Sequence, residues 1–353
     1  MTRARWARVL IVEDSPAAAR LLVDGISRDQ RLAVAGVALT AGEAVTLAEQ
    51  LRPDVITVDL TLPDETGLDV ILRVLRKFYV PIIVVSSQTG NGSSTPAFRA
   101  LLAGAADMVP KPTGDPAALR AFFEDLNERI ASLAKAQAVP THRPTTLRPA
   151  RGRSQANGAS LEVVVVGAST GGPPALVEFL SGLGADFPAP VVIVQHIAAP
   201  FIEGLVRWLN QETPLPVKLA SDGEALEAGV GYIAPASSDL LFKSGGRLSV
   251  KSVQAVRATI APSADALFES AADVYKSRCV AVLLSGMGKD GAAGLLKVRA
   301  KGGKTFAQDE GSCTVFGMPG AAGRMGAVEA FADPRSIAAS LRKLVEKPER
   351  TTE

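Results

Sequence analysis

The sequence predicts an α/β protein of two doubly wound parallel-sheet domains joined by a flexible linker. Short apolar runs alternate with amphipathic helical segments at the start of the chain, and the alternation resumes after a proline- and arginine-rich stretch. A chain of 353 residues is too long for one ordinary core, and a hydrophobic content of 47% is typical of globular proteins. We expect domains at residues 1–125 and 161–345. Residues 126–160 should hold the end of a helix and the linker.

Buried parallel strands of the first domain are indicated by apolar runs without polar alternation. The expected strands are Val9–Val12, Leu32–Val37, Val55–Val58, Pro81–Val85 and Ala105–Val109. Ser15 and Pro16 supply an N-cap and a first-turn proline for the first helix, and Asp115 with Pro116 does so for the last. Five such βα units predict a flavodoxin-like sheet of order 2-1-3-4-5, with a site where the strand order reverses.

The linker and the second domain follow from a change in composition. Residues 137–160 contain three prolines and four arginines with almost nothing large and apolar, so we expect a solvated spacer. The α/β pattern then predicts a Rossmann-like domain. Its expected strands are Leu161–Val166, Val191–Gln195, Val217–Leu219, Gly231–Ala234 and Val280–Ser285, and its expected helices include Pro173–Ser181, Phe201–Asn210 and Ala264–Tyr275.

Charge and hydropathy exclude several classes of protein. A net charge of +2 gives no electrostatic footprint for nucleic acid, and no apolar stretch approaches the roughly 18 residues needed to span a bilayer. The basic start of the chain leads into a strand, not into a signal peptide. The two cysteines, Cys279 and Cys313, are interpreted as reduced core residues. We expect a cytoplasmic protein with no nucleic-acid partner and no direct membrane insertion.

Three carboxylates follow neighbouring strands of the first domain. Glu13 and Asp14 end the first strand and Asp59 ends the third, so they should converge in one crevice. Mutual repulsion of buried carboxylates is relieved by a hard cation such as Mg²⁺, beside which a carboxylate can become an aspartyl phosphate. Lys111 and Ser86 end two further strands and can neutralise or hydrogen-bond the phosphoryl oxygens. Taken singly, each residue has an ordinary structural interpretation as a cap or a surface group.

Together, the motifs E-D-S, D-L-T-L-P-D-E-T-G, V-V-S-S and K-P resemble a response-regulator receiver domain. The resemblance implies that Asp59 is the phosphoacceptor and that Glu13, Asp14 and Asp59 hold Mg²⁺. It also implies that Ser86 and Lys111 are the switch pair. One departure is Met108, which stands where the family usually has an aromatic ring three residues before the lysine.

A second candidate site begins at the glycine turn G-A-S-T-G (Gly167–Gly171), with Ser169 at its apex. The pattern fits a nucleophile elbow, and the amides of the turn and the following helix N-terminus can stabilise an oxyanion. The same kind of turn also binds phosphates, and at this point the two interpretations are equally weighted. Against nucleotide binding, the chain has no G-x-G-x-x-G here and no G-K-[ST] after the turn.

The position of one of the two histidines favours hydrolysis over nucleotide binding. The chain has two histidines, and His142 lies in the expected linker, so imidazole chemistry falls to His196 at the end of a strand. A lone histidine is more often structural, but Asp290 follows a third strand and can hold the imidazole tautomer. The order Ser169, His196, Asp290 differs from that of α/β-hydrolases.

The motifs G-A-S-T-G-G, Q-H, S-G-M-G-K-D-G-A-A-G and A-Q-D-E-G-S-C-T-V-F-G-M-P resemble the methylesterase domain of the CheB family of chemotaxis proteins. The resemblance implies Ser169 as nucleophile, His196 as general base and acid, and Asp290 as orienting group, with support from Thr170 and Met287. It implies no cofactor for the esterase. The implied substrates are glutamyl methyl esters, and also glutamines, on the cytoplasmic helices of methyl-accepting chemoreceptors. The implied kinase is the histidine kinase of the chemosensory array.

Three segments depart from the family pattern: residues 197–200, 234–240 and 257–263. These changes concern substrate choice more than triad chemistry. We expect a hydrolase in which the unphosphorylated receiver covers the Ser169 crevice and phosphorylation of Asp59 favours an open arrangement. The alternatives are a catalytically weak adaptor that binds receptors or other proteins, and a regulator with a nucleic-acid output domain. For the latter the sequence has neither a helix-turn-helix pattern nor a basic face.

Overall fold

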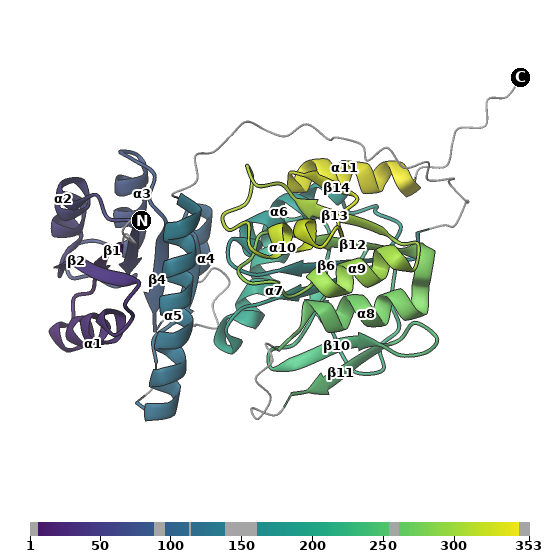
Figure 1. Cartoon of the computed structure of the whole chain (residues 1–353), viewed down its shortest axis with the longest axis horizontal. Coiled ribbons are helices and arrows are strands. Elements are labelled where there is room, and N and C mark those ends of the chain that lie inside the picture. Colours follow the sequence, from purple (N-terminus) through teal and green to yellow (C-terminus); the bar gives the residue numbers. More distant parts are fainter. Residues whose placement is uncertain (1–5, 88–95, 113, 138–160, 254–260, 346–353) are drawn as a thin grey trace, which may run out of the picture. The chain divides into compact units, whose positions relative to one another are not determined.

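The structure is a computed structural model that describes residues 6–87, 96–112, 114–137, 161–253 and 261–345. The chain divides into two compact units, residues 1–140 and 141–353 (Figure 1). Both units are α/β folds built on a parallel sheet, which confirms the predicted fold class. Most of the expected linker, residues 138–160, lies outside the described residues, whereas residues 126–137 continue a helix.

The first unit has the strand order predicted from the sequence, β2-β1-β3-β4-β5. Its strands are β1 (Ala7–Val12), β2 (Leu32–Ala38), β3 (Val55–Val58), β4 (Ile82–Ser86) and β5 (Asp107–Pro110). Its helices are α1 (Pro16–Ser27), α2 (Ala41–Leu51), α3 (Gly67–Leu75), α4 (Pro96–Leu102) and α5 (Pro116–Gln137). Helix α1 packs against α5, and α3 packs against α2 and α4, so helices cover both faces of the sheet.

Helix α1 begins at the residues predicted from the sequence. The Ser15 hydroxyl accepts a hydrogen bond from the Ala18 amide at 3.4 Å and caps α1, which has a proline in its first turn. Strand β1 pairs in parallel with β3, with Val12 opposite Val58. The residues that follow these two strands therefore emerge side by side at one edge of the sheet.

The second unit has a parallel sheet of order β14-β13-β12-β6-β7-β9-β8 and a separate antiparallel hairpin, β10-β11. Its strands are β6 (Val163–Ala168), β7 (Val191–Gln195), β8 (Val217–Leu219), β9 (Gly231–Ile233), β10 (Ser238–Phe242), β11 (Leu248–Ser252), β12 (Cys279–Leu283), β13 (Lys304–Gln308) and β14 (Ala330–Ala332). Its helices are α6 (Gly172–Leu183), α7 (Ile202–Glu212), α8 (Ala264–Tyr275), α9 (Ala292–Ala300), α10 (Met318–Arg324) and α11 (Pro334–Val345), with short 3₁₀ turns at Ala199–Phe201 and Lys276–Arg278.

Strand order reverses beside β6. The chain runs from β6 outward through β7 on one side and later through β12, β13 and β14 on the other. Helices α6, α7 and α11 pack together, as do α8, α9 and α10, so this sheet also lies between two helical layers. In such a sheet, ligands bind beyond the carboxyl ends of the strands at the reversal. That edge carries the residues after β6, β7 and β12.

Several elements of the second unit have no counterpart among those predicted from the sequence: β10, β11, β13, β14, α9, α10 and α11. The hairpin strands mix polar and apolar residues, and only part of each strand is buried. Without a continuous apolar run, such short strands give little periodic signal. In the described part of the chain, no helix combines the length and apolarity required to cross a bilayer.

Candidate functional site

Ser169 and His196 are the first residues after two adjacent strands of the second sheet. Strands β6 and β7 pair in parallel with Ala168 opposite Gln195, and the His196 amide donates to the Ala168 carbonyl at 2.9 Å. On the other side of β6, the Ser169 amide donates to the Ser285 carbonyl, just beyond β12, at 3.0 Å. The ends of three strands thus meet at Ser169, which is 5% exposed.

A glycine turn places Ser169 at the N-terminus of α6. Gly171 has φ +74°, a left-handed conformation that favours glycine, and α6 begins at the next residue. A Cβ atom on Gly171 would lie 2.4 Å from Thr314 Cβ and 2.8 Å from the Ser285 hydroxyl. Backbone conformation and close packing therefore both require glycine at this position.

His196 is hydrogen-bonded to Asp290, with 2.9 Å between Nε2 and Oδ2. The same carboxylate accepts hydrogen bonds from the N-terminus of α8. The donors are the Ser263 hydroxyl at 3.0 Å and the amides of Ala264 and Asp265 at 2.7 and 3.1 Å. Burial by itself would raise the pKa of Asp290, but the interactions with His196 and the two amides outweigh it and lower the pKa to about 2. Asp290 is therefore held as an anion.

The other imidazole nitrogen of His196, Nδ1, is not used by Asp290. Among the described residues, no hydrogen bond joins the Ser169 hydroxyl to His196, and the ring's bond to Asp290 uses Nε2. Catalytic hydrogen bonds often tighten only when substrate is bound. The structure thus joins two members of the expected triad directly and places the third at the end of the neighbouring strand.

The expected supporting residues flank Ser169. Thr170 follows it in the same turn and is buried, and its carbonyl accepts from the Ser285 hydroxyl at 2.8 Å. Met287 follows Gly286, where an added Cβ would lie 2.8 Å from Ser169 Cβ. The turn that carries Met287 therefore runs directly beside the Ser169 side chain.

Three further polar residues at this edge have no role predicted from the sequence: Gln195, Ser285 and Ser263. Gln195 is buried at the end of β7, where its side-chain amide donates to the Ser169 and His196 carbonyls. Ser263 caps α8 and also donates to Asp290. A signal exists for each: Gln195 and Ser285 are polar residues directly after apolar runs, and Ser263 precedes a helical pattern.

The altered segments lie partly within the described residues. Residues 197–200 lead into the 3₁₀ turn before α7, and residues 234–240 lead into β10. Of residues 257–263, the first four lie outside the described part, whereas Ser263 belongs to the Asp290 site.

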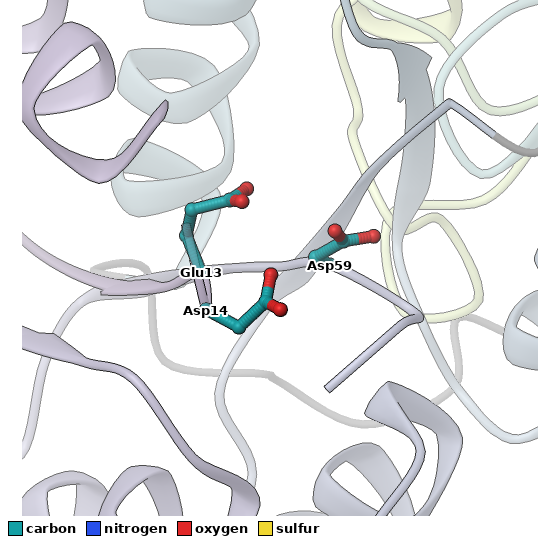
Figure 2. A group of neighbouring side chains, drawn as sticks. All are labelled: Glu13, Asp14 and Asp59. Carbon is teal, nitrogen blue, oxygen red and sulfur yellow. The ribbon is translucent and has the colours of Figure 1, made fainter. Parts of the chain in front are cut away.

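The three carboxylates of the first unit converge as their positions after β1 and β3 require. Oxygen atoms of Glu13, Asp14 and Asp59 lie within 4.8 Å of one another (Figure 2). The Lys111 ammonium bridges two of them, at 2.6 Å from Asp59 and 2.7 Å from Glu13. Burial raises the pKa of Glu13, whereas the bonds to Asp59 and Glu13 outweigh burial and raise the pKa of Lys111. The cluster is thus a set of hard oxygen donors, suited to a metal ion, with a cation already beside it.

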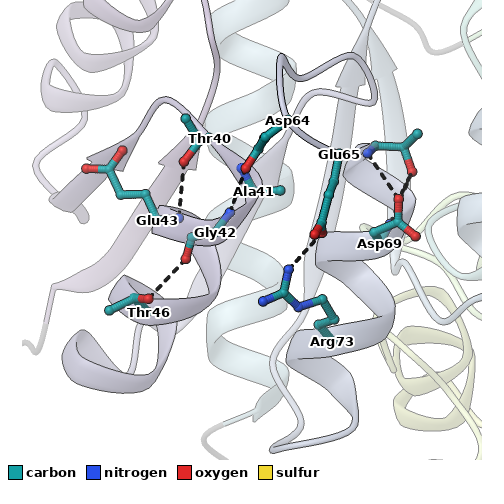
Figure 3. Close-up of polar contacts among 10 residues, drawn as sticks. Thr40, Ala41, Gly42, Glu43, Thr46, Asp64, Glu65, Asp69 and Arg73 are labelled. Carbon is teal, nitrogen blue, oxygen red and sulfur yellow. Dashed lines mark hydrogen bonds and ion pairs between the residues drawn. The ribbon is translucent and has the colours of Figure 1, made fainter.

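Ser86 and Met108 lie on the next two strands of the sheet, β4 and β5. Ser86 is buried at the end of β4, and its carbonyl accepts from the Lys111 amide at 3.0 Å. Met108 is buried within β5. The loop after Asp59 is fixed to the start of α2, since the Asp64 carboxylate accepts from the amides of Ala41 and Gly42 at 2.9 and 3.1 Å (Figure 3).

Comparison with known proteins shows the family of the chain. The model of the CheB methylesterase family matches residues 164–341, and that of the response regulator receiver domain matches residues 9–124. The chain belongs to the CheB methylesterase family. This CheB-family chain is therefore an enzyme, a methylesterase joined to a response-regulator receiver domain.

Its relatives span nearly the whole chain. It is 41% identical over 342 residues to "Protein-glutamate methylesterase/protein-glutamine glutaminase 2" of Anaeromyxobacter dehalogenans, covering 96% of this chain and 97% of the relative. It is also 41% identical over 323 residues to the protein numbered 3 of the same name from Myxococcus xanthus, covering 91% and 89%. The crystal structure of the Thermotoga maritima CheB methylesterase catalytic domain is 38% identical, with a TM-score of 0.50, and covers 53% of this chain and all of that domain.

Proposed function

We propose that this methylesterase hydrolyses glutamyl methyl esters on the cytoplasmic helices of methyl-accepting chemoreceptors, with Ser169 as nucleophile, His196 as general base and acid, and Asp290 as orienting group. The observation that carries the proposal is the 2.9 Å bond between His196 Nε2 and Asp290 Oδ2, at the end of the strand next to Ser169. Its relatives are named protein-glutamate methylesterase/protein-glutamine glutaminase, which agrees with this substrate.

In the first step, the Ser169 hydroxyl attacks the ester carbonyl carbon and its proton passes to His196. Because Asp290 engages Nε2, Nδ1 is the nitrogen that accepts this proton. Asp290, with its pKa lowered to about 2, stays ionised and stabilises the imidazolium that forms. When the tetrahedral intermediate collapses, the imidazolium returns the proton to the departing oxygen. Methanol leaves, and the glutamyl group remains bonded to Ser169.

In the second step, His196 deprotonates a water molecule that attacks the acyl-enzyme. Collapse of the second intermediate frees Ser169, which regains its proton, and releases the glutamate side chain. Ammonia can leave in place of methanol by the same steps, so the same residues would deamidate a receptor glutamine. Thr170 and Met287 support the reaction from the turns beside Ser169, and the esterase needs no cofactor.

The receiver domain, residues 1–125 in this proposal, regulates the esterase domain, residues 161–345, through residues 126–160. Glu13, Asp14 and Asp59 would hold Mg²⁺, and the three carboxylates within 4.8 Å of one another suit that ion. The ion, when bound, would offset negative charge on a phosphoryl group. Asp59 would accept that group from the histidine kinase of the chemosensory array, and Ser86 and Lys111 would contact its oxygens. The reaction would take place in the cytoplasm, where these receptor helices and the kinase lie.

The test is methanol release from membranes bearing labelled methylated receptors, with and without Mg²⁺ and a small phosphoryl donor. Ser169→Ala should lower the rate by roughly 10⁴- to 10⁶-fold, because the triad acts as a unit. Ser181→Ala, the same change in the last turn of α6, is the control and should match the parent. Full methanol release by Ser169→Ala would refute the hydrolytic mechanism. Equal rates with and without the donor would refute regulation alone, and receptor binding by a parent without turnover would favour an adaptor.

A further inference from the structure

A buried glutamine joins the turns that carry the proposed nucleophile and base. Gln195 is the last residue of β7 and is 2% exposed. Its side-chain Nε2 donates to the Ser169 carbonyl at 2.8 Å and to the His196 carbonyl at 3.0 Å. One side-chain amide therefore fixes the backbone of both residues, although it reaches neither the hydroxyl nor the imidazole.

The opposite side of the turn is held by a serine. The Ser285 hydroxyl donates to the Thr170 carbonyl at 2.8 Å and accepts from the Val315 amide at 3.1 Å. The Ser285 amide in turn donates to the side chain of Gln308 at 2.7 Å. Two successive carbonyls of the nucleophile turn, those of Ser169 and Thr170, are thus each bound by a side chain from a flanking strand end.

Fixing these carbonyls fixes the amides of the same peptide units. In a trans peptide the N–H and C=O bonds point in opposite directions, and among the described residues the one cis peptide bond is Ala261–Pro262. The Ser169 carbonyl accepts from Gln195 and also from the Gly172 amide, each at 2.8 Å. Because Gln195 holds this carbonyl from its own side, the Thr170 N–H points away from Gln195. We propose that Gln195 is a positioning residue that orients the Thr170 amide as a donor to the oxyanion of the reaction. This inference rests on the proposed hydrolytic function of Ser169.

The surroundings of Gln195 indicate that its orientation matters more than its own hydrogen-bond balance. Its Oε1 atom is buried and has no hydrogen-bond partner among the described residues, which is unfavourable for a buried acceptor. A Cβ atom on Gly172 would lie 2.2 Å from this oxygen, so glycine at the start of α6 makes room for it. The orientation that lets Nε2 donate to two carbonyls therefore leaves Oε1 without a partner among the described residues.

The test uses Gln195→Met, which keeps the size of the side chain and removes its donor. A donor that is part of an oxyanion hole contributes about 10²- to 10³-fold to kcat, so a misdirected one should lower kcat by about 10- to 100-fold. KM for methylated receptor should stay within about twofold. The inhibition constant of a glutamyl trifluoromethyl ketone, which forms a tetrahedral anion on Ser169, should rise by the same factor as kcat falls. Loss of folded enzyme would instead lower the apparent kcat and leave the inhibition constant unchanged, so the linked change separates positioning from destabilisation.

Two further variants keep the inference falsifiable. Gly172→Ala should displace the Gln195 side chain and shift kcat and the inhibition constant in the same direction, although alanine ordinarily favours a helix. Asn210→Leu is the matched control, since the Asn210 amide also donates to two carbonyls, those of Val206 and Val217, in another part of the unit. It should leave both values unchanged.

The outcomes separate this inference from the proposed function. If the parent is active and Ser169→Ala is not, but folded Gln195→Met keeps kcat and the inhibition constant within twofold, the positioning role is wrong and the mechanism stands. If Gln195→Met does not fold, unchanged values in Gly172→Ala overturn the inference by themselves. If Ser169→Ala remains active, the proposed function fails first.

Discussion

The two units treat a carboxylate at a strand end in opposite ways. Asp290 of the second unit receives hydrogen bonds from a hydroxyl and two amides at the start of α8, as well as from His196, and its pKa is lowered to about 2. Glu13 of the first unit is buried beside Asp59, and burial raises its pKa even though Lys111 lies at 2.7 Å. Asp290 is held as an anion by His196 first and by the α8 amides second, whereas the pKa of Glu13 stays raised although a lysine lies beside it.

This difference matches what each site is proposed to do. A triad carboxylate must remain charged while one imidazole changes its protonation, so fixed dipoles serve it well. A phosphoacceptor site must instead exchange cations and accept a doubly charged group, which a cluster of poorly compensated carboxylates allows. The same edge of this kind of sheet thus supports two chemistries: one unit pairs a single carboxylate with an imidazole and helix amides, and the other gathers three carboxylates beside a lysine.

Of the changes that test this comparison, removing the charge of Asp290 has the largest expected effect. Asp290→Asn presents an amide to His196, which favours the wrong tautomer and should lower kcat for methanol release by about 10³- to 10⁴-fold. Asp222→Asn, an exposed aspartate that pairs with Lys243, is the control for the same change. The comparison would fail if Asp290→Asn kept more than a tenth of the parent kcat while remaining folded.

A smaller effect is expected in acid. The folded pKa of Asp290, about 2, lies below its ordinary value of 3.8, so its contribution is present above about pH 4 and is lost as the pH falls toward 2. The size of that contribution is about 2 kcal/mol. The free energy of unfolding of the parent, minus that of Asp290→Asn, should shrink by this amount between pH 5 and pH 2. A difference that does not change with pH would show that His196 and the α8 amides do not stabilise the anion of Asp290 in the folded protein.

The smallest expected effect is on metal binding by the first unit. Lys111→Met removes the ammonium that lies 2.6 Å from Asp59 and 2.7 Å from Glu13, and with it a charge that opposes a cation. Mg²⁺ affinity measured by calorimetry on the full chain should rise by about tenfold. Lys77→Met, which removes an exposed lysine paired with Glu49, should leave it unchanged. Equal affinities in the parent and Lys111→Met would mean that the lysine and the ion do not compete.

Strand positions of the two sheets could largely be predicted from the sequence, because continuous apolar runs give a strong local signal. The runs at Val55–Val58, Val191–Gln195 and Val217–Leu219 agree with the structure at both ends. The hairpin β10-β11 could not be predicted in this way, since its strands Ser238–Phe242 and Leu248–Ser252 are only partly buried and mix polar with apolar residues. Their pairing depends on packing against α8, which no local pattern encodes.

Some residues of the candidate site could likewise be predicted from the sequence, and others could not. Ser169, His196 and Asp290 could be singled out because each follows an apolar run and carries distinctive chemistry. Gln195 and Ser263 lack such chemistry, and their importance lies in which distant groups they reach. Gln195 reaches Ser169 across 26 residues of the chain, and Ser263 reaches Asp290 across 27, so these contacts depend on strand order and helix placement.

The sequence by itself determined the two α/β units, the strand ends that carry the polar residues, and the turn at Gly171 that admits a serine before a helix. These follow from apolar periodicity and backbone sterics, which act over a few residues. Only the tertiary structure decided that His196 meets Asp290 through Nε2, that α8 compensates the carboxylate, and that Gln195 holds the nucleophile's peptide. Hydrogen bonds across a sheet edge depend on distances of a few tenths of an ångström, and those are set by the packing of the whole unit.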